Sequence, residues 1–199
     1  PIEVRFGIEQ IFVSTMQAVS GAGYPGVASM DILDNVVPYI GGEEEKMEAE
    51  TLKLLGKLHG HAVEPLHAGM TAHCNRVPVV DGHTECVSLK LRKKATKEEL
   101  LAAWAEFQPL AGCNLPTAPD VPVQWAHQPD RPQPRLDRNR GNGMAVTVGR
   151  LRPCNLLDWK FVLLSHNTVR GAAGATILNA ELLVSLGKLE PAAAAVARA

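Results

Sequence analysis

An arginine and a histidine, seven positions apart, are the residues of this chain best suited to chemistry. Arg76 and His83 lie in the segment NRVPVVDGHTE, residues 75–85. A guanidinium can clamp a carboxylate with two parallel hydrogen bonds, and an imidazole can move a proton near neutral pH. The pair therefore suits a small acidic substrate. The alternative is a structural salt bridge and a buried histidine, and the spacing alone does not decide between the two.

The chain offers no standard nucleophile to act beside this pair. Cys74 is the first of its 4 cysteines, and no Gly-x-Ser-x-Gly elbow occurs in the sequence. The cysteines form no Cys-x-x-Cys pair, which predicts reduced thiols in a cytoplasmic protein.

Two further groups of residues resemble cofactor or metal sites. Residues 21–26, GAGYPG, match Gly-x-Gly-x-x-Gly, but Pro25 disfavours the helix that a dinucleotide fingerprint begins there. We favour a tight loop whose free amides face a substrate. The histidines of residues 59–73 have no standard zinc spacing, and no later cluster completes four ligands. We therefore predict no metal.

Charged residues 43–53 belong to a predicted helix over residues 43–58, whose acidic first turn suits the helix dipole. Glu50 and Lys53 are three positions apart and share one helix face. They indicate either a solvated face or two side chains that point together into a cleft.

Composition narrows the class of protein. The chain has 199 residues, a hydrophobic content of 46% and a net charge of −1, which fit one domain with a real core. The near-neutral charge argues against nucleic-acid binding. No apolar run approaches the ~18 residues of a membrane span, and the first residues lack a signal-peptide layout.

The elements that must position these residues follow no regular βα alternation. Strands are predicted over residues 11–16, 84–91, 144–151 and 160–165, and residues 62–80 are expected to be extended. A capping box at residues 96–99 begins a helix to about residue 108, and residues 167–186 form another. Residues 113–142 are expected to be irregular, and residues 190–199 to fray. This order predicts an α+β fold with a mainly antiparallel sheet and flanking helices.

Four segments together resemble a known enzyme family. Residues 14–26, 43–53, 75–85 and 166–174 look like aspartate-semialdehyde dehydrogenase of the archaeal and fungal branch, and residues 129–138 resemble the fungal members most. The resemblance runs in order from residue 6 to residue 186.

The resemblance implies a domain organisation. Family members have an N-terminal Rossmann domain, which binds NADPH and carries a nucleophilic cysteine, and a second domain that binds substrate and forms a dimer. The second domain has a fold like the C-terminal domain of glyceraldehyde-3-phosphate dehydrogenase. This chain resembles the second domain over residues 1–165 and a returning helix over residues 166–186, followed by a tail, residues 187–199.

The resemblance also implies roles for individual residues. Gln17 would orient the acyl group, Arg76 would grip the α-carboxylate, and His83 would act as general acid and base. Glu50 and Lys53 would bind the substrate. Asn167 and Gly171 would border the nicotinamide, but only if a Rossmann domain is supplied.

The implied reaction is the NADPH-dependent reductive dephosphorylation of β-aspartyl phosphate to aspartate semialdehyde. Without the nucleophile and the Rossmann domain, we expect this chain alone to bind no cofactor and to lack this activity. We expect a homodimer that binds a small acidic substrate, and a separate dinucleotide-binding domain as a candidate partner. One alternative is a cofactor-free lyase, cyclase or isomerase that uses Arg76 and His83, and another is a non-catalytic interaction module.

Overall fold

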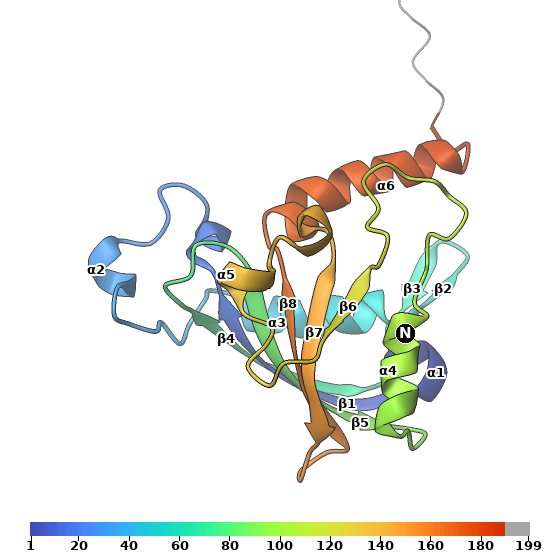
Figure 1. Ribbon diagram of the computed structural model, residues 1–199, viewed down its shortest axis with the longest axis horizontal. Helices are drawn as coiled ribbons and strands as arrows, with labels where there is room; N and C mark the ends of the chain where they lie inside the picture. The colour runs from blue at the N-terminus through green and yellow to red at the C-terminus, as the bar shows by residue number, and fades with distance from the viewer. Residues whose placement is uncertain (190–199) are drawn as a thin grey trace, which may run out of the picture.

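The computed structural model describes residues 1–189, which fold around a six-stranded sheet (Figure 1). The strand order is β4-β1-β5-β8-β7-β6. In this order the strands are β4 (Gly69–Arg76), β1 (Ile8–Gln17), β5 (His83–Leu91), β8 (Trp159–Ser165), β7 (Val146–Pro153) and β6 (Val123–Ala126). The three central pairings are antiparallel, and the two edge pairings, β1 with β4 and β6 with β7, are parallel. The prediction of an α+β fold with a mainly antiparallel sheet is confirmed.

Helices and a small hairpin surround this sheet. The longer helices are α3 (Glu43–Leu54), α4 (Lys97–Ala105) and α6 (Gly174–Ser185), and α6 continues a π-helical turn, Val169–Ala173. The short elements are α1 (Ile2–Phe6), α2 (Ser29–Ile32), α5 (Pro134–Asp137), the 3-10 turns Val19–Ala22 and Arg140–Gly143, and the hairpin strands β2 (Lys57–His59) and β3 (Ala62–Glu64). In Figure 1, α6 lies across the top of the sheet, and α2 lies in a loop that projects to the left.

Several predicted boundaries differ from the observed ones. The helix that begins at Glu43 ends at Leu54 instead of residue 58, because Gly56 packs against the backbone of Glu64, where a β-carbon would collide. The predicted capping box is present: Thr96 accepts the Glu99 N–H, and the Glu99 carboxylate accepts the Thr96 N–H. Its helix ends at residue 105, three residues early. The segment 113–142, expected to be irregular, contains β6 and α5, and the predicted frayed tail lies outside the described residues.

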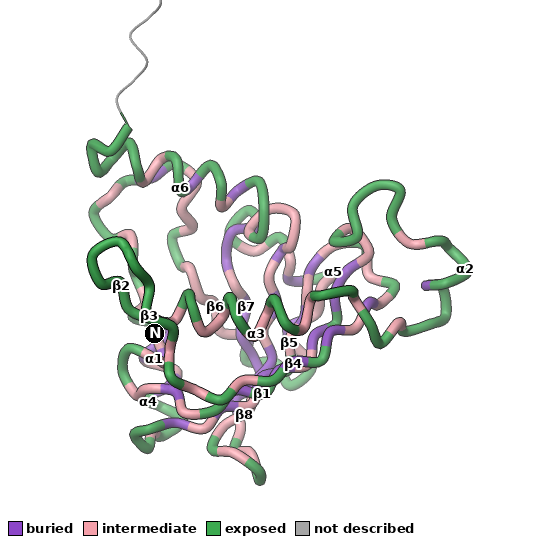
Figure 2. Tube along the Cα trace, turned by 180° about the vertical axis from the view of Figure 1, so that it is seen from behind, coloured by how far each residue is buried: buried purple, intermediate pink, exposed green. Residues whose placement is uncertain are grey.

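The main core lies between one face of the sheet and the helices α1 and α4. Trp104 of α4 stacks on Trp125 of β6 at 6.2 Å and meets Phe161 of β8 edge-on at 5.1 Å. Burial is concentrated along the strands, whereas α3 has no buried residue and α6 buries Gly174 and Leu178 (Figure 2). We call the face of the sheet that α1 and α4 cover the inner face. The opposite, outer face exposes Phe12 and Met16 of β1.

The inner face also contains an apolar hollow of about 370 Å³. Its walls come from α1, α3, α4 and the sheet, and Glu85 of β5 is the acidic side chain that the central strands contribute to it. The strand pattern explains this position, because Glu85 alternates in step with Val87, Leu89 and Leu91, which are all buried.

Candidate substrate-binding site

Three of the predicted site residues lie along one edge of the sheet, at the ends of neighbouring strands. Gln17 ends β1 and Arg76 ends β4, and the parallel register pairs the two directly. His83 begins β5, which runs antiparallel to β1, so its first residue lies at the same edge. We call Gln17, Arg76 and His83 the edge cluster.

The backbone of Ala18 joins two members of the edge cluster. The Arg76 Nη1 donates to the Ala18 carbonyl at 2.8 Å, and the Ala18 N–H donates to His83 Nδ1 at 3.1 Å. A neutral imidazole whose Nδ1 accepts a hydrogen bond carries its proton on Nε2. In this geometry His83 therefore presents Nε2–H as a donor.

Gly21 closes over the edge cluster from the glycine-rich loop. A β-carbon at this position would lie 2.8 Å from Arg76 Nη1 and 3.1 Å from His83 Nε2. Only a residue without a side chain allows the backbone to approach both groups this closely. The prediction of free amides in this loop is wrong at Gly21 and Gly23, whose N–H groups donate to the carbonyls of Ala18 and Ser20. No helix begins at the end of the motif, so residues 21–26 do not form the dinucleotide fingerprint.

The charge state of the edge cluster follows from burial. Desolvation lowers the pKa of His83 to about 4, and the nearby positive charge of Arg76 acts in the same direction. His83 is therefore neutral at pH 7. Desolvation also lowers the pKa of Arg76, which is only 7% exposed, and Glu43 opposes that shift. A buried guanidinium beside a neutral imidazole leaves a positive site for an anion.

The first turn of α3 adds an acid and a base next to this cluster. Gln17 Nε2 donates to Glu43 Oε1 at 3.4 Å, and Lys46 Nζ lies 3.9 Å from Glu43 Oε2. Sequence reasoning missed both residues, although Glu43 and Lys46 have the same three-residue spacing as Glu50 and Lys53.

The structure does not bring Glu50 and Lys53 to the edge cluster. Glu44 accepts the Cys74 N–H at 2.8 Å and Glu48 accepts the Ala72 N–H at 3.1 Å, so α3 runs antiparallel to β4. At ~1.5 Å per residue, Glu50 and Lys53 lie roughly 9 and 14 Å beyond Glu44 along the helix axis, away from Arg76. Both side chains are exposed.

Asn167 occupies a structural position between two parts of the site. Its Oδ1 accepts the Gly82 N–H at 2.8 Å, and its Nδ2 donates to Ser20 Oγ at 2.8 Å. It thereby ties the residue before His83 to the residue before Gly21. Gly171 lies exposed in the π-helical turn, and its N–H donates to the His166 carbonyl.

Glu85 is a perturbed acid that sequence reasoning missed. It lies two residues after His83 on β5, with neighbours Thr15 and Leu163 across the sheet. Desolvation raises its pKa to about 7. Among residues 1–189 no hydrogen bond or ion pair to its carboxylate is present. The sequence does carry a signal for it: Glu85 occupies a position of β5 whose alternate neighbours, Val87 and Leu89, point to the inner face.

The histidines considered for a metal site lie apart from this cluster. His59 and His67 each contact Glu64, at 3.0 and 3.4 Å, on the β2–β3 hairpin and the loop after it. Within the described part of the chain, no three His, Cys, Asp or Glu side chains gather as metal ligands would. None of the described helices has the length and apolar character needed to cross a membrane.

Comparison with known proteins shows the family of the chain. The family model described as semialdehyde dehydrogenase, dimerisation domain, matches residues 1–170. The aspartate-semialdehyde dehydrogenase of Archaeoglobus fulgidus is 52% identical over 178 residues, which are 89% of this chain and 51% of that protein. The Candida albicans enzyme is 50% identical over 195 residues, covering 92% of this chain and 53% of that protein.

The solved structures give the same result. The crystal structure of aspartate-semialdehyde dehydrogenase with NADP from Candida albicans matches with a TM-score of 0.85 and 45% identity. The match covers 95% of this chain and 54% of that one. The chain thus spans about half the length of its relatives. It belongs to the family of semialdehyde dehydrogenase dimerisation domains.

Proposed function

We propose that this chain is the substrate-binding and dimerisation part of a cytoplasmic aspartate-semialdehyde dehydrogenase, and that it works with a separate NADP-binding part. The observation that carries the proposal is the edge cluster, in which Gln17, Arg76 and His83 meet around the backbone of Ala18. The reaction is the reductive dephosphorylation of β-aspartyl phosphate. NADP, when bound by the other part, supplies the hydride chemistry.

Arg76 binds the α-carboxylate of the substrate in this proposal. One of its nitrogens, Nη1, already donates to Ala18, which fixes the guanidinium and leaves its other N–H groups for a carboxylate. Gln17 offers its amide to the carbonyl end of the substrate. His83 offers Nε2–H as a hydrogen-bond donor to an oxygen on which negative charge develops, and stabilises that charge.

Glu43 and Lys46 take the roles that the resemblance assigned to Glu50 and Lys53. The contact of Glu43 with Gln17 supports this assignment, and Lys46 lies within 3.9 Å of Glu43. Glu43 is suited to the amino group of the substrate, and Lys46 to its phosphate. The chain forms a homodimer in this proposal, which the description of its family as a dimerisation domain supports.

We expect Arg76→Ala to weaken the binding of aspartate semialdehyde and related dicarboxylates about 30-fold. Loss of the bidentate, charge-assisted pair costs on the order of 2 kcal/mol. Isothermal titration calorimetry measures the affinity. Arg92→Ala is the matched control, because Arg92 is exposed and follows β5 at the end opposite His83. Unchanged binding by a folded Arg76→Ala variant would contradict the proposal.

Inorganic phosphate separates the two candidate lysines. We expect Lys46→Ala to weaken phosphate binding by about 2- to 5-fold, because an exposed charge pair contributes up to ~1 kcal/mol. Lys53→Ala should bind phosphate as the unmodified chain does, since Lys53 lies two helical turns farther from Arg76. The opposite result, with only Lys53→Ala impaired, would restore the original assignment.

A further inference from the structure

The two residues before His83 form a turn that is held from the side by α5. Gly82 has a φ of +100°, and a β-carbon there would lie 3.2 Å from Leu164 Cδ1, 3.3 Å from Arg138 Cβ and 3.4 Å from Pro134 Cβ. The Arg138 Nη1 also donates to the Asp81 carbonyl at 3.2 Å. The turn that leads directly into His83 is therefore in contact with Pro134 of α5 and with Arg138, the residue that follows the helix.

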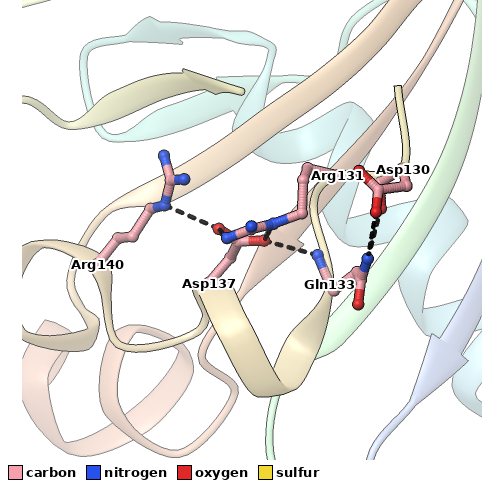
Figure 3. A network of polar contacts seen from close by, with 5 residues as sticks. All are labelled: Asp130, Arg131, Gln133, Asp137 and Arg140. Atoms are coloured by element: carbon pink, nitrogen blue, oxygen red, sulfur yellow. Dashed lines mark hydrogen bonds and ion pairs between the residues drawn. The ribbon is translucent and has the colours of Figure 1, made fainter. Parts of the chain in front are cut away.

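The α5 helix cannot hold this position by itself. It has 4 residues, too few for a stable isolated helix. Asp137, which is 1% exposed, fixes it through three hydrogen bonds and an ion pair (Figure 3). The carboxylate accepts Arg131 Nε at 2.6 Å and the Gln133 N–H at 2.7 Å, and Arg131 Nη2 completes a bidentate pair. Arg140 Nε forms an ion pair with Asp137 Oδ1 at 2.9 Å.

Asp137 remains ionised in this setting. Burial raises the pKa of its carboxyl, but the hydrogen bonds from Arg131 and Gln133 and the charge of Arg140 outweigh burial and hold the pKa below its ordinary value. Its contacts all come from residues 131–140, so it organises the whole segment around α5. Asp130, close by in sequence, contacts only the side chain of Gln133 among the described residues.

We propose that Asp137 is a positioning residue for His83, which acts through α5 and the Asp81–Gly82 turn. Asp137 locks α5, and Pro134 and Arg138 of this segment pack against the turn. The turn sets the point at which β5 begins, and so places the His83 ring under the Ala18 N–H. This inference rests on the proposed role of His83 as a hydrogen-bond donor to the substrate.

The position of the His83 ring determines how well it is shielded from water and how close it lies to the charge of Arg76. The imidazole is kept neutral by burial, and Arg76 of β4 is the charged side chain that faces it. If α5 loosens, the turn relaxes, the ring loses its fixed contact with Ala18, and water reaches Nε2. The pKa of His83 then rises toward the ordinary value of 6.5.

The test is the titration of His83 in the 199-residue chain, followed by NMR with histidine labelled at Cε1. We expect the unmodified chain to titrate near pH 4 and Asp137→Asn to titrate at least ~1 pH unit higher. Asp137→Asn replaces one acceptor oxygen with an NH2 group that faces the Arg131 donors. Asp130→Asn is the matched control and should titrate as the unmodified chain does.

A second variant keeps the test decisive if Asp137→Asn does not fold. Arg138→Ala removes the bond to the Asp81 carbonyl but leaves the Asp137 contacts in place, and should shift the His83 titration in the same direction by a smaller amount. Arg135→Ala, on the exposed side of the same helix, should not. Folding is checked by near-UV circular dichroism.

The outcomes separate this inference from the proposed function. A folded Asp137→Asn or Arg138→Ala variant in which His83 titrates as in the unmodified chain would overturn the positioning role. Failure of the unmodified chain to bind any dicarboxylate would instead count against the proposed function, and the His83 titration can still be measured in that case.

Discussion

His83→Ala should lower kcat/KM by about 10²- to 10³-fold in a complete enzyme, because removing one positioned hydrogen-bond donor to a developing negative charge costs about that factor. The enzyme for this test joins residues 1–189 of this chain to the NADP-binding half of the Candida albicans relative, with which the chain shares 50% identity. Reduction of NADP by aspartate semialdehyde and phosphate reports the reaction in reverse. The expected loss is in kcat, since His83 acts on charge that develops during the reaction.

His73→Ala provides the control for that experiment. His73 lies on β4, like Arg76, but its side chain is exposed and packs edge-on against Phe12 on the outer face. We expect its kcat/KM to match that of the unmodified chimera. If His83→Ala retained more than about one tenth of the activity, His83 would not supply this hydrogen bond in the reaction, and Arg76 and Gln17 would bind substrate without it.

Local patterns were sufficient to predict several elements of the fold. The capping box of Thr96 and Glu99 correctly located the start of α4, and alternation over residues 84–91 correctly located β5. The boundaries of other elements depend on tertiary contacts that local patterns do not contain. The end of α3 is set by the approach of Gly56 to the hairpin, and β6 has 4 residues that become a strand only by pairing with β7.

The candidate site, too, could be predicted only in part from local patterns. Seven positions separate Arg76 from His83, so one short turn returns the chain to the same sheet edge. The approach of Gln17 to Arg76 depends on the parallel pairing of β1 with β4, a long-range feature that no motif encodes. The resemblance placed Gln17 in the site but not Glu43, because an acid and a lysine three positions apart occur twice on α3.

Glu85→Gln should raise the free energy of unfolding of this chain by about 2–3 kcal/mol at pH 8, and by less than about 0.5 kcal/mol at pH 4. In the folded state burial raises the pKa of Glu85 from 4.5 to about 7. Between these values the folded state holds a proton that the unfolded state has released. The stability that this group contributes is therefore present below pH 4.5 and is lost as the pH rises through 7.

The glutamine side chain has nearly the shape of the protonated acid and no charge to desolvate, so it removes the penalty above pH 7 and changes little at pH 4. Urea unfolding of both proteins at the two pH values measures the difference, and other titrating groups cancel because they are common to both. Glu50→Gln, at an exposed position on α3, should show no such pH-dependent gain. An equal gain from Glu85→Gln at pH 4 and pH 8 would mean that Glu85 is ionised and solvated in the folded chain, and that the hollow beside it is open to water.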